Sequence, residues 1–236
     1  VDLPSVPPAS VQLAAGVPLR DYLGITDRKE RVLMLVTFDD VPVALGTRQG
    51  VVKRIVPSAL PVRPEVEVIA LKPGDEVVGA AAAPDSAELV FMTTDAQLLR
   101  FSASTVRPQG APAGGMAGMN VSSKAGAVFF GAVSGADAVA VSISGAEGVI
   151  PGTDAGRVKV SRFDEFPAKG RATGGVRAHS FLKGEDRLTL AWVGPAPALA
   201  VGPDGAVRSL PEATAKRDAS GQPLEAVIGS IGRALG

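Results

Sequence analysis

The chain of 236 residues contains no cysteine and only one histidine, one tyrosine and one tryptophan. The absence of cysteine excludes disulfides, thiolate-bound zinc and thiol catalysis. A single histidine, His179, does not allow a histidine-rich metal site or a Ser-His-Asp triad to be assembled. We therefore expect no catalytic residue, no metal site and no cofactor in this chain.

Long apolar runs and an excess of charge of one sign are also missing. The 24 basic and 24 acidic residues balance to a net charge of zero, which argues against strong non-specific affinity for nucleic acid. No stretch approaches the roughly 18 apolar residues of a membrane span, and residues 1–10 lack the pattern of a signal peptide. We expect a cytoplasmic protein that does not contact membranes, and a chain that forms part of something larger.

Sequence compatible with long helices is scarce. Glycine (28) and proline (19) together occupy many positions, and they interrupt every longer helical pattern. Short helical turns are predicted only at residues 19–23 and near Asp164. Because 46% of the residues are hydrophobic and 20% are charged, the chain is expected to be globular and all-β.

One segment recurs four times, as a turn rich in Thr, Asp and Gly followed by alternating apolar and basic residues. It covers residues 45–54, 91–100, 151–160 and 201–210. Aligning Gly50, Ala96, Gly156 and Gly205 gives intervals of 46, 60 and 49 residues. A second element with a polar turn and an apolar run precedes each copy, at residues 25–35, 71–80, 121–130 and 182–191. Both elements are typical of β-hairpins.

Two hairpins per repeat predict a four-stranded blade of a radial β architecture. One domain, 1–236, would then contain blade units at about 11–60, 66–107, 116–168 and 175–217, with a tail at 218–236. A blade cannot bury both faces alone, so the blades must pack on one another. An insertion is expected at 142–152. Two roles for the tail stay open, an incomplete fifth blade formed with the N-terminal segment or a docking tail.

Basic residues concentrate in the recurring segments and just after them. Residues 48–63 and 97–124 contain no acid, and residues 157–183 hold seven basic residues against two acidic ones. Several acids lie instead in the hairpin turns. One edge of the ring is therefore expected to be basic and able to bind phosphates. The candidate DNA-binding residues are Arg48, Lys53, Arg54, Arg100, Arg157, Lys159, Arg162, Lys169, Arg171 and Arg177. Ordinary solvated or edge-protecting charges are the alternative.

Three segments carry a family resemblance. Residues 44–60, ALGTRQGVVKRIVPSAL, resemble the outer-strand signature of the C-terminal domain in the A subunits of DNA gyrase and topoisomerase IV. Residues 66–80 resemble the inner hairpin of that domain with its G-D-E-V turn, and residues 169–186 resemble its G-R-x-T-x-G-V-R linker. The resemblance implies a β-pinwheel, a propeller-like ring with strand exchange between blades. It further implies that the rim binds and bends duplex DNA for a type IIA topoisomerase.

The resemblance also implies what lies outside this chain. The tyrosine nucleophile would belong to the rest of the A subunit, and ATP and Mg²⁺ to the holoenzyme with its ATPase B subunit, at the nucleoid. Residues 108–118, PQGAPAGGMAG, keep Gln109, Gly114 and Gly115 of a gyrase-type box but lack its arginines, which favours a topoisomerase IV-like domain.

The rival from another class is a propeller-like protein-interaction module without DNA binding, which the neutral charge favours. The two differ in salt dependence, because phosphate contacts weaken steeply with salt and a packed protein interface does not.

Overall fold

The computed structural model describes residues 17–37, 39–63, 65–148 and 155–233. Within them lie one short helix, α1 (Leu19–Tyr22), and three 3-10 turns, η2 (Pro57–Ala59), η3 (Ala103–Thr105) and η4 (Phe163–Glu165). The predicted helical turns at 19–23 and near Asp164 are therefore confirmed by α1 and η4.

The strands are β1 (Val43–Thr47), β2 (Val51–Ile55), β3 (Val77–Ala82), β4 (Glu88–Thr93), β5 (Gln97–Ser102), β6 (Met116–Ala117), β7 (Ala127–Val133), β8 (Ala138–Gly145), β9 (Arg157–Arg162), β10 (Val176–Arg177), β11 (Arg187–Pro195), β12 (Ala198–Val201), β13 (Val207–Arg208), β14 (Gln222–Pro223) and β15 (Ser230–Arg233). The predicted insertion at 142–152 begins inside β8, and its residues 149–152 lie outside the described part of the chain.

The strands form four antiparallel sheets, which we call the first to fourth blades. Their strand orders are β3-β1-β2-β6, β10-β5-β4-β7, β11-β8-β9-β14 and β13-β12-β15. The hairpin turns between the two central strands demand a left-handed residue, with φ of 84° at Gly50, 59° at Ala96 and 75° at Gly156. The predicted all-β pinwheel with four blades is confirmed, although the fourth sheet has three strands instead of four.

Strand exchange links the blades. The first blade takes its central hairpin from residues 43–55, its inner strand β3 from the next repeat, and its outer strand β6 from the repeat after that. The second and third blades repeat this arrangement with β7 and β10, and with β11 and β14. Each of the first three blades is thus joined to the two segments that follow its own repeat in the sequence.

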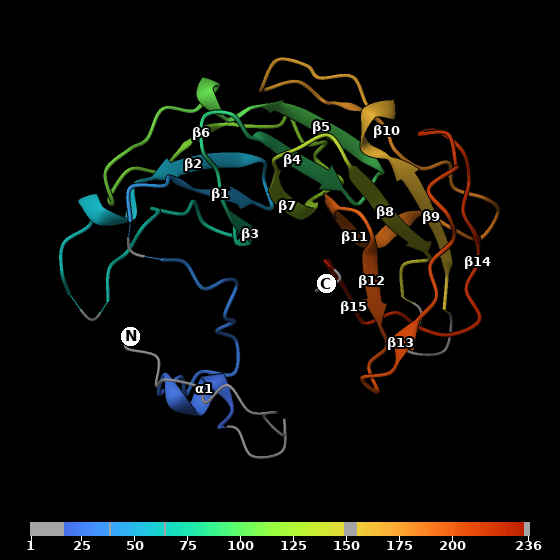
Figure 1. The fold of residues 1–236 in the computed structure, drawn as a ribbon, viewed down its shortest axis with the longest axis horizontal. Coiled ribbons are helices and arrows are strands. Elements are labelled where there is room, and N and C mark those ends of the chain that lie inside the picture. Colours follow the sequence, from blue (N-terminus) through green and yellow to red (C-terminus); the bar gives the residue numbers. More distant parts are fainter. Residues whose placement is uncertain (1–16, 38, 64, 149–154, 234–236) are drawn as a thin grey trace.

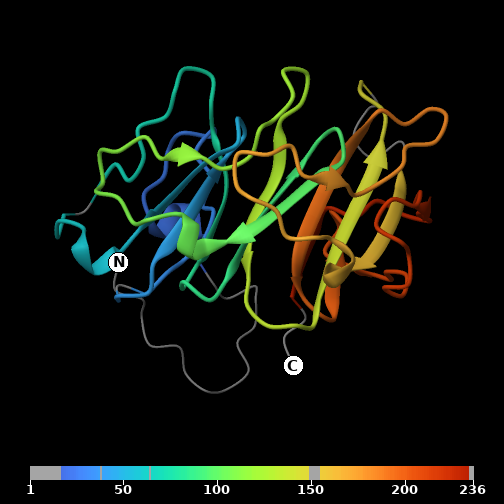
Figure 2. The same cartoon turned by 90° about the horizontal axis from the view of Figure 1, so that it is seen from above.

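The hydrophobic core lies between neighbouring blades. One cluster joins the first and second blades around Phe91 and Phe130, a second joins the second and third, and a third joins the third and fourth. Small residues allow neighbouring blades to approach closely. A Cβ on Gly79 of the first blade would lie 2.2 Å from the backbone oxygen of Phe130 in the second. Figure 1 shows the blades as an arc with β3, β7, β11 and β15 on its concave side, and Figure 2 shows the same arc from above.

Candidate nucleic-acid interface

The predicted DNA-binding residues differ in burial and in their partners. Lys53, Arg54 and Lys159 are buried, with 0%, 1% and 2% of their surface exposed. The expectation that these three charges lie on an exposed basic edge is therefore wrong. Each charged group donates hydrogen bonds to oxygens inside the domain, as burial of a charge requires, although Arg54 Nε has no partner among the described residues.

Lys53, on β2, holds the loop that leads to the exchanged strand β6. Its Nζ donates to the backbone oxygens of Gly110, Ala111 and Ala113, each at 2.7 Å. Burial lowers the pKa of Lys53, and the charge of Glu67 opposes that shift. The three carbonyls saturate the donors of one ammonium group, so no donor is left for a phosphate.

Arg54, the neighbour of Lys53 on β2, fastens the first blade to the second. Its guanidinium donates to the backbone oxygens of Ala103, at the start of η3, and of Val106, directly after η3, at 2.8 and 3.0 Å. It also donates to the Ala83 oxygen at 2.8 Å and to the Asp85 carboxylate at 2.7 Å. The planar fork of arginine suits such a set of partners.

Lys159 repeats the role of Lys53 two blades further on. Its Nζ donates to the backbone oxygens of Lys216, at 3.1 Å, and of Arg217, in the loop that leads to β14. Burial lowers the pKa of Lys159 to about 8. In the second blade, Leu99 takes the corresponding position and is packed in the core.

Two further predicted residues are half-buried and already engaged. Arg100 lies 4.6 Å from the ring centroid of Phe163 and 3.2 Å from the carboxylate of Glu88. Arg157 donates to the Gly221 oxygen at 2.9 Å and lies 3.5 Å from the Glu185 carboxylate. Arg100 thus links the second blade to η4, and Arg157 links the third blade to the segment before β14.

Arg48 and Arg162 are exposed but paired with acids. Arg48 lies 3.2 Å from the Glu76 carboxylate in the opposing hairpin turn. Arg162 contacts the Asp164 carboxylate at 2.6 Å, which raises the pKa of Arg162 and lowers that of Asp164. Such exposed pairs are weak and can exchange partners.

The remaining three predicted residues, Lys169, Arg171 and Arg177, lie on the segment between η4 and the end of β10. Lys169 and Arg177 are exposed and Arg171 is half-buried. No acid among the described residues lies within ion-pair distance of any of the three. These cations are available to a ligand.

This segment joins the equivalent segment of the preceding repeat to form one band, residues 106–120 and 166–177. Arg171 Nη1 donates to the Ala117 oxygen at 2.8 Å, and the amide of Asn120 donates to the Thr173 oxygen at 3.0 Å. Figure 1 places both segments on the convex side of the arc. The band carries four cations that have no acidic partner among the described residues, namely Arg107, Lys169, Arg171 and Arg177.

Arg107 belongs to the band but not to the candidates predicted from the sequence. It is exposed and lies just after η3, as Lys169 lies just after η4. Arg107 could have been found from the absence of acidic residues in 97–124. The alternating pattern of the strands favoured Lys53 and Arg54 instead.

His179 is a buried structural residue, 2% exposed, beneath the third blade. Its Nε2 accepts the amide hydrogen of Gly221 at 3.1 Å, which leaves Nδ1 to donate to Ser142 Oγ at 2.9 Å. Burial, with the nearby charges of Lys159 and Arg157, lowers the pKa of His179 to about 4. His179 is therefore neutral and anchors the start of β14.

Parts of the sequence, and the fold as a whole, are similar to known proteins. A family described as the DNA gyrase C-terminal domain, beta-propeller, matches residues 87–133 and 152–190. The match covers less than half of the chain and shows a similarity to that family. The match includes β4, β5, β6, β7, β9 and β10, and the segments that carry Arg107, Lys169, Arg171 and Arg177.

Curated relatives are also similar to parts of the chain. The chain is 30% identical over 115 residues to the topoisomerase subunit TopoM, and 27% identical over 155 residues to the A subunit of DNA gyrase, both of Mycolicibacterium smegmatis. These matches cover 49% and 64% of the chain but 15% and 17% of the relatives, so the chain spans under a fifth of their length.

Solved structures share the fold. The structure is similar to that of the C-terminal domain of DNA topoisomerase IV, with a TM-score of 0.74 and 20% identity over 92% of this chain and 69% of that one. It is also similar to that of a DNA gyrase A C-terminal domain, with a TM-score of 0.64 and 16% identity over 83% and 66%. Both likenesses concern the fold.

Two features are absent from the described residues. No helix there is long and apolar enough to cross a membrane. No group of three or more His, Asp or Glu side chains in the same residues is placed to hold a metal ion.

Proposed function

We propose that this domain binds duplex DNA along the convex band, without reading its sequence, and bends it for a topoisomerase. The observation that supports the proposal most strongly is the band itself. Arg107, Lys169, Arg171 and Arg177 follow one another over two joined segments without an acidic partner among the described residues. Cations in such a row can replace the counterions of successive phosphates, and contacts of this kind position DNA without specifying bases.

The curvature of the arc supports the bending part of the proposal. A duplex that follows cations on a convex surface must bend, and the cost depends on DNA deformability rather than on base contacts. We further propose that the domain acts as a non-catalytic part of an ATP-dependent type IIA topoisomerase. Its partners would be nucleoid DNA, the remainder of the A subunit, and the B subunit that carries the ATPase. ATP and Mg²⁺ would bind elsewhere in the holoenzyme.

We further propose that the parent enzyme resembles topoisomerase IV more than gyrase. The segment 108–118 lacks the arginines of a gyrase-type box, and its Lys53-bound turn points three carbonyls inward. Arg107 is the one cation of residues 106–118. This favours modest bending over tight wrapping.

A mobility-shift titration with linear duplex tests the proposal. With about four phosphates neutralised, affinity should fall on the order of 100-fold between about 50 and 200 mM salt. Lys169→Glu with Arg177→Glu should abolish the shift, because both side chains are exposed and lack an acidic partner among the described residues.

Lys72→Glu with Lys183→Glu is the matched control, because it reverses the same number of exposed charges in the hairpin turns before β3 and β11. The control should bind like the parent. Absence of binding by the parent at low salt would contradict the proposal and favour a protein-interaction module.

A further inference from the structure

Residues 31–36 repeat the inner strands of the blades but join no described sheet. They lie 46 residues before β3, the interval that also separates Gly50 from Ala96. The strands β3, β7 and β11 each pair with the central hairpin of the preceding repeat. The inner edges of the four sheets are occupied by β3, β7, β11 and β15. Residues 31–36 therefore have no acceptor among the described blades.

The main chain of residues 31–37 is free to pair. None of its amide or carbonyl groups hydrogen-bonds to another described residue. The segment is nevertheless held against the first blade, because Arg31 lies 3.3 Å from the Glu76 carboxylate and Met34 packs against the core around Val43 and Ile69. A fixed stretch of unpaired main chain is a template for strand addition.

The side chains of this segment leave apolar surface in solvent. Leu35 is 61% exposed, and Val32, Leu33 and Val36 are exposed as well. In an extended chain Leu33 and Leu35 lie on the side opposite Met34, away from the core of the first blade. Scattered exposed hydrophobics are ordinary, but a run of this length on the surface indicates an interaction site.

The order of these side chains reads the same in both directions about Met34. Residues 32–36 are V-L-M-L-V. Antiparallel pairing of two copies centred on Met34 sets valine opposite valine, leucine opposite leucine, and the two methionines opposite each other. Apolar cross-strand pairs stabilise a sheet. A twofold interface requires one patch that is complementary to itself, and this segment meets that requirement.

The flanking charges have the same symmetry. Arg28 and Lys29 precede the segment, and Asp39 and Asp40 follow it. All four are exposed, and none forms an ion pair with a described residue. Antiparallel order brings the cations of one copy to the acids of the other at both ends, whereas parallel order would bring like charges together. Charge complementarity of this kind selects the partner and its orientation.

We propose that residues 31–37 are a docking site for a second copy of this chain, which pairs with them as an antiparallel strand about a twofold axis at Met34. Figure 1 shows the chain between α1 and β1 at the open side of the arc, away from the convex band. The dimer would therefore leave the band accessible to DNA.

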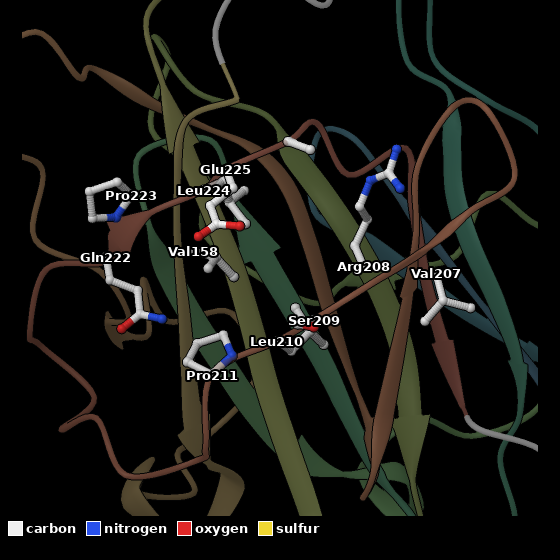
Figure 3. Close-up of a pocket in the computed structure, with 11 residues that line it drawn as sticks. Val158, Val207, Arg208, Ser209, Leu210, Pro211, Gln222, Pro223, Leu224 and Glu225 are labelled. Atoms are coloured by element: carbon white, nitrogen blue, oxygen red, sulfur yellow. The ribbon is translucent and has the colours of Figure 1, made fainter.

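Sedimentation equilibrium of the 236-residue chain tests the proposal. The mass should rise with protein concentration from 23.9 kDa to twice that value. Leu35→Lys should keep the chain monomeric, because it places a charge in the centre of the apolar pair. Val207→Lys is the matched control, since Val207 is 67% exposed beside a groove of about 580 Å³ in the fourth blade (Figure 3). The control should dimerise like the parent.

Exchange of the flanking charges tests the register. Arg28→Glu with Lys29→Glu, and separately Asp39→Lys with Asp40→Lys, should each give a monomer, because both ends of the pair would then join like charges. An equimolar mixture of the two double variants should restore the dimer, since both ends of the mixed pair join unlike charges.

A parent chain that is monomeric at every concentration up to its solubility limit would overturn the proposal, and a blade outside this chain would then be the partner of the segment. A dimer that survives Leu35→Lys, or a mixture of the charge variants that stays monomeric, would overturn it too. So would a series of larger assemblies, because a twofold interface closes at two copies. The readout does not depend on DNA binding, so the proposal can fail or succeed separately from the proposed function.

Discussion

Lys53 and Lys169 are both lysines of basic segments in this repeat protein, yet they differ in almost every physical respect. Lys53 lies on a central strand, is fully buried, and donates to three backbone oxygens of the loop before β6. Lys169 lies on the segment that leads to an exchanged strand and is exposed. The position of a cation relative to the exchanged strand decides whether it holds two blades together or faces a ligand.

The largest effect is expected for Arg54→Met, which keeps the apolar stem but leaves the oxygens of Ala83, Ala103 and Val106 without their donor. The loss of these bonds should lower the free energy of unfolding by about 4 kcal/mol. Urea unfolding followed by circular dichroism measures it. Arg107→Met is the exposed control and should change stability by less than about 0.5 kcal/mol. Equal losses of unfolding free energy in both variants would contradict the distinction between buried and exposed arginines.

The next effect comes from His179, a neutral group beside buried cations. Its pKa in the folded protein is about 4, below the ordinary value of 6.5. The unfolded chain therefore binds the proton more tightly, and stability is lost as the pH falls from 6.5 to about 4. The loss should approach about 3 kcal/mol.

Urea midpoints between about pH 7 and pH 4 measure this loss. His179→Asn should lower the stability at neutral pH, because the bonds to Ser142 and Gly221 weaken, and should flatten this part of the pH profile. An unchanged pH slope in the variant would assign the acid sensitivity to other groups.

A smaller loss is expected for Lys53→Met and for Lys159→Met, about 2 kcal/mol each, because each frees carbonyls that are partly accessible to water. Thermal unfolding at neutral pH measures both. Lys→Arg at the same positions should recover part of the loss, since arginine retains the charge and the donors. Variants as stable as the parent would show that the buried ammonium groups do not hold the loops.

The smallest effect on stability is expected for Arg177→Gln, below about 0.5 kcal/mol, because the side chain is exposed and loses no ion pair with any described acid. DNA affinity should nevertheless fall several-fold, measured by fluorescence anisotropy with a short duplex at low salt. The same substitution at Arg48, which is paired with Glu76, should weaken binding less.

Much of the fold could be predicted from the sequence. The turn residues Gly50, Ala96 and Gly156 mark the hairpins, because each takes a left-handed φ between two strands. The strand partners could not be derived from the periodicity, since β3 follows the first hairpin in sequence by more than 20 residues and still pairs with it. Strand exchange entered only through the family resemblance.

The site was predictable only in part. The alternation along β2 predicted one exposed face, but Val52, Lys53, Arg54 and Ile55 are all buried in the structure. Arg107, Lys169 and Arg171 lie in irregular segments, where no periodicity marks orientation. Arg107 was missed for that reason, although its acid-free surroundings were visible in the sequence.

The most direct test of the division between buried and exposed cations is the salt dependence of DNA binding for three proteins, the parent, Lys53→Met, and Lys169→Gln with Arg177→Gln. The slope of log affinity against log salt reports the number of phosphates neutralised. The slope should be unchanged for folded Lys53→Met and smaller by about 2 for the double variant. A reduced slope for Lys53→Met, with the double variant unchanged, would contradict the account and place DNA on the central strands.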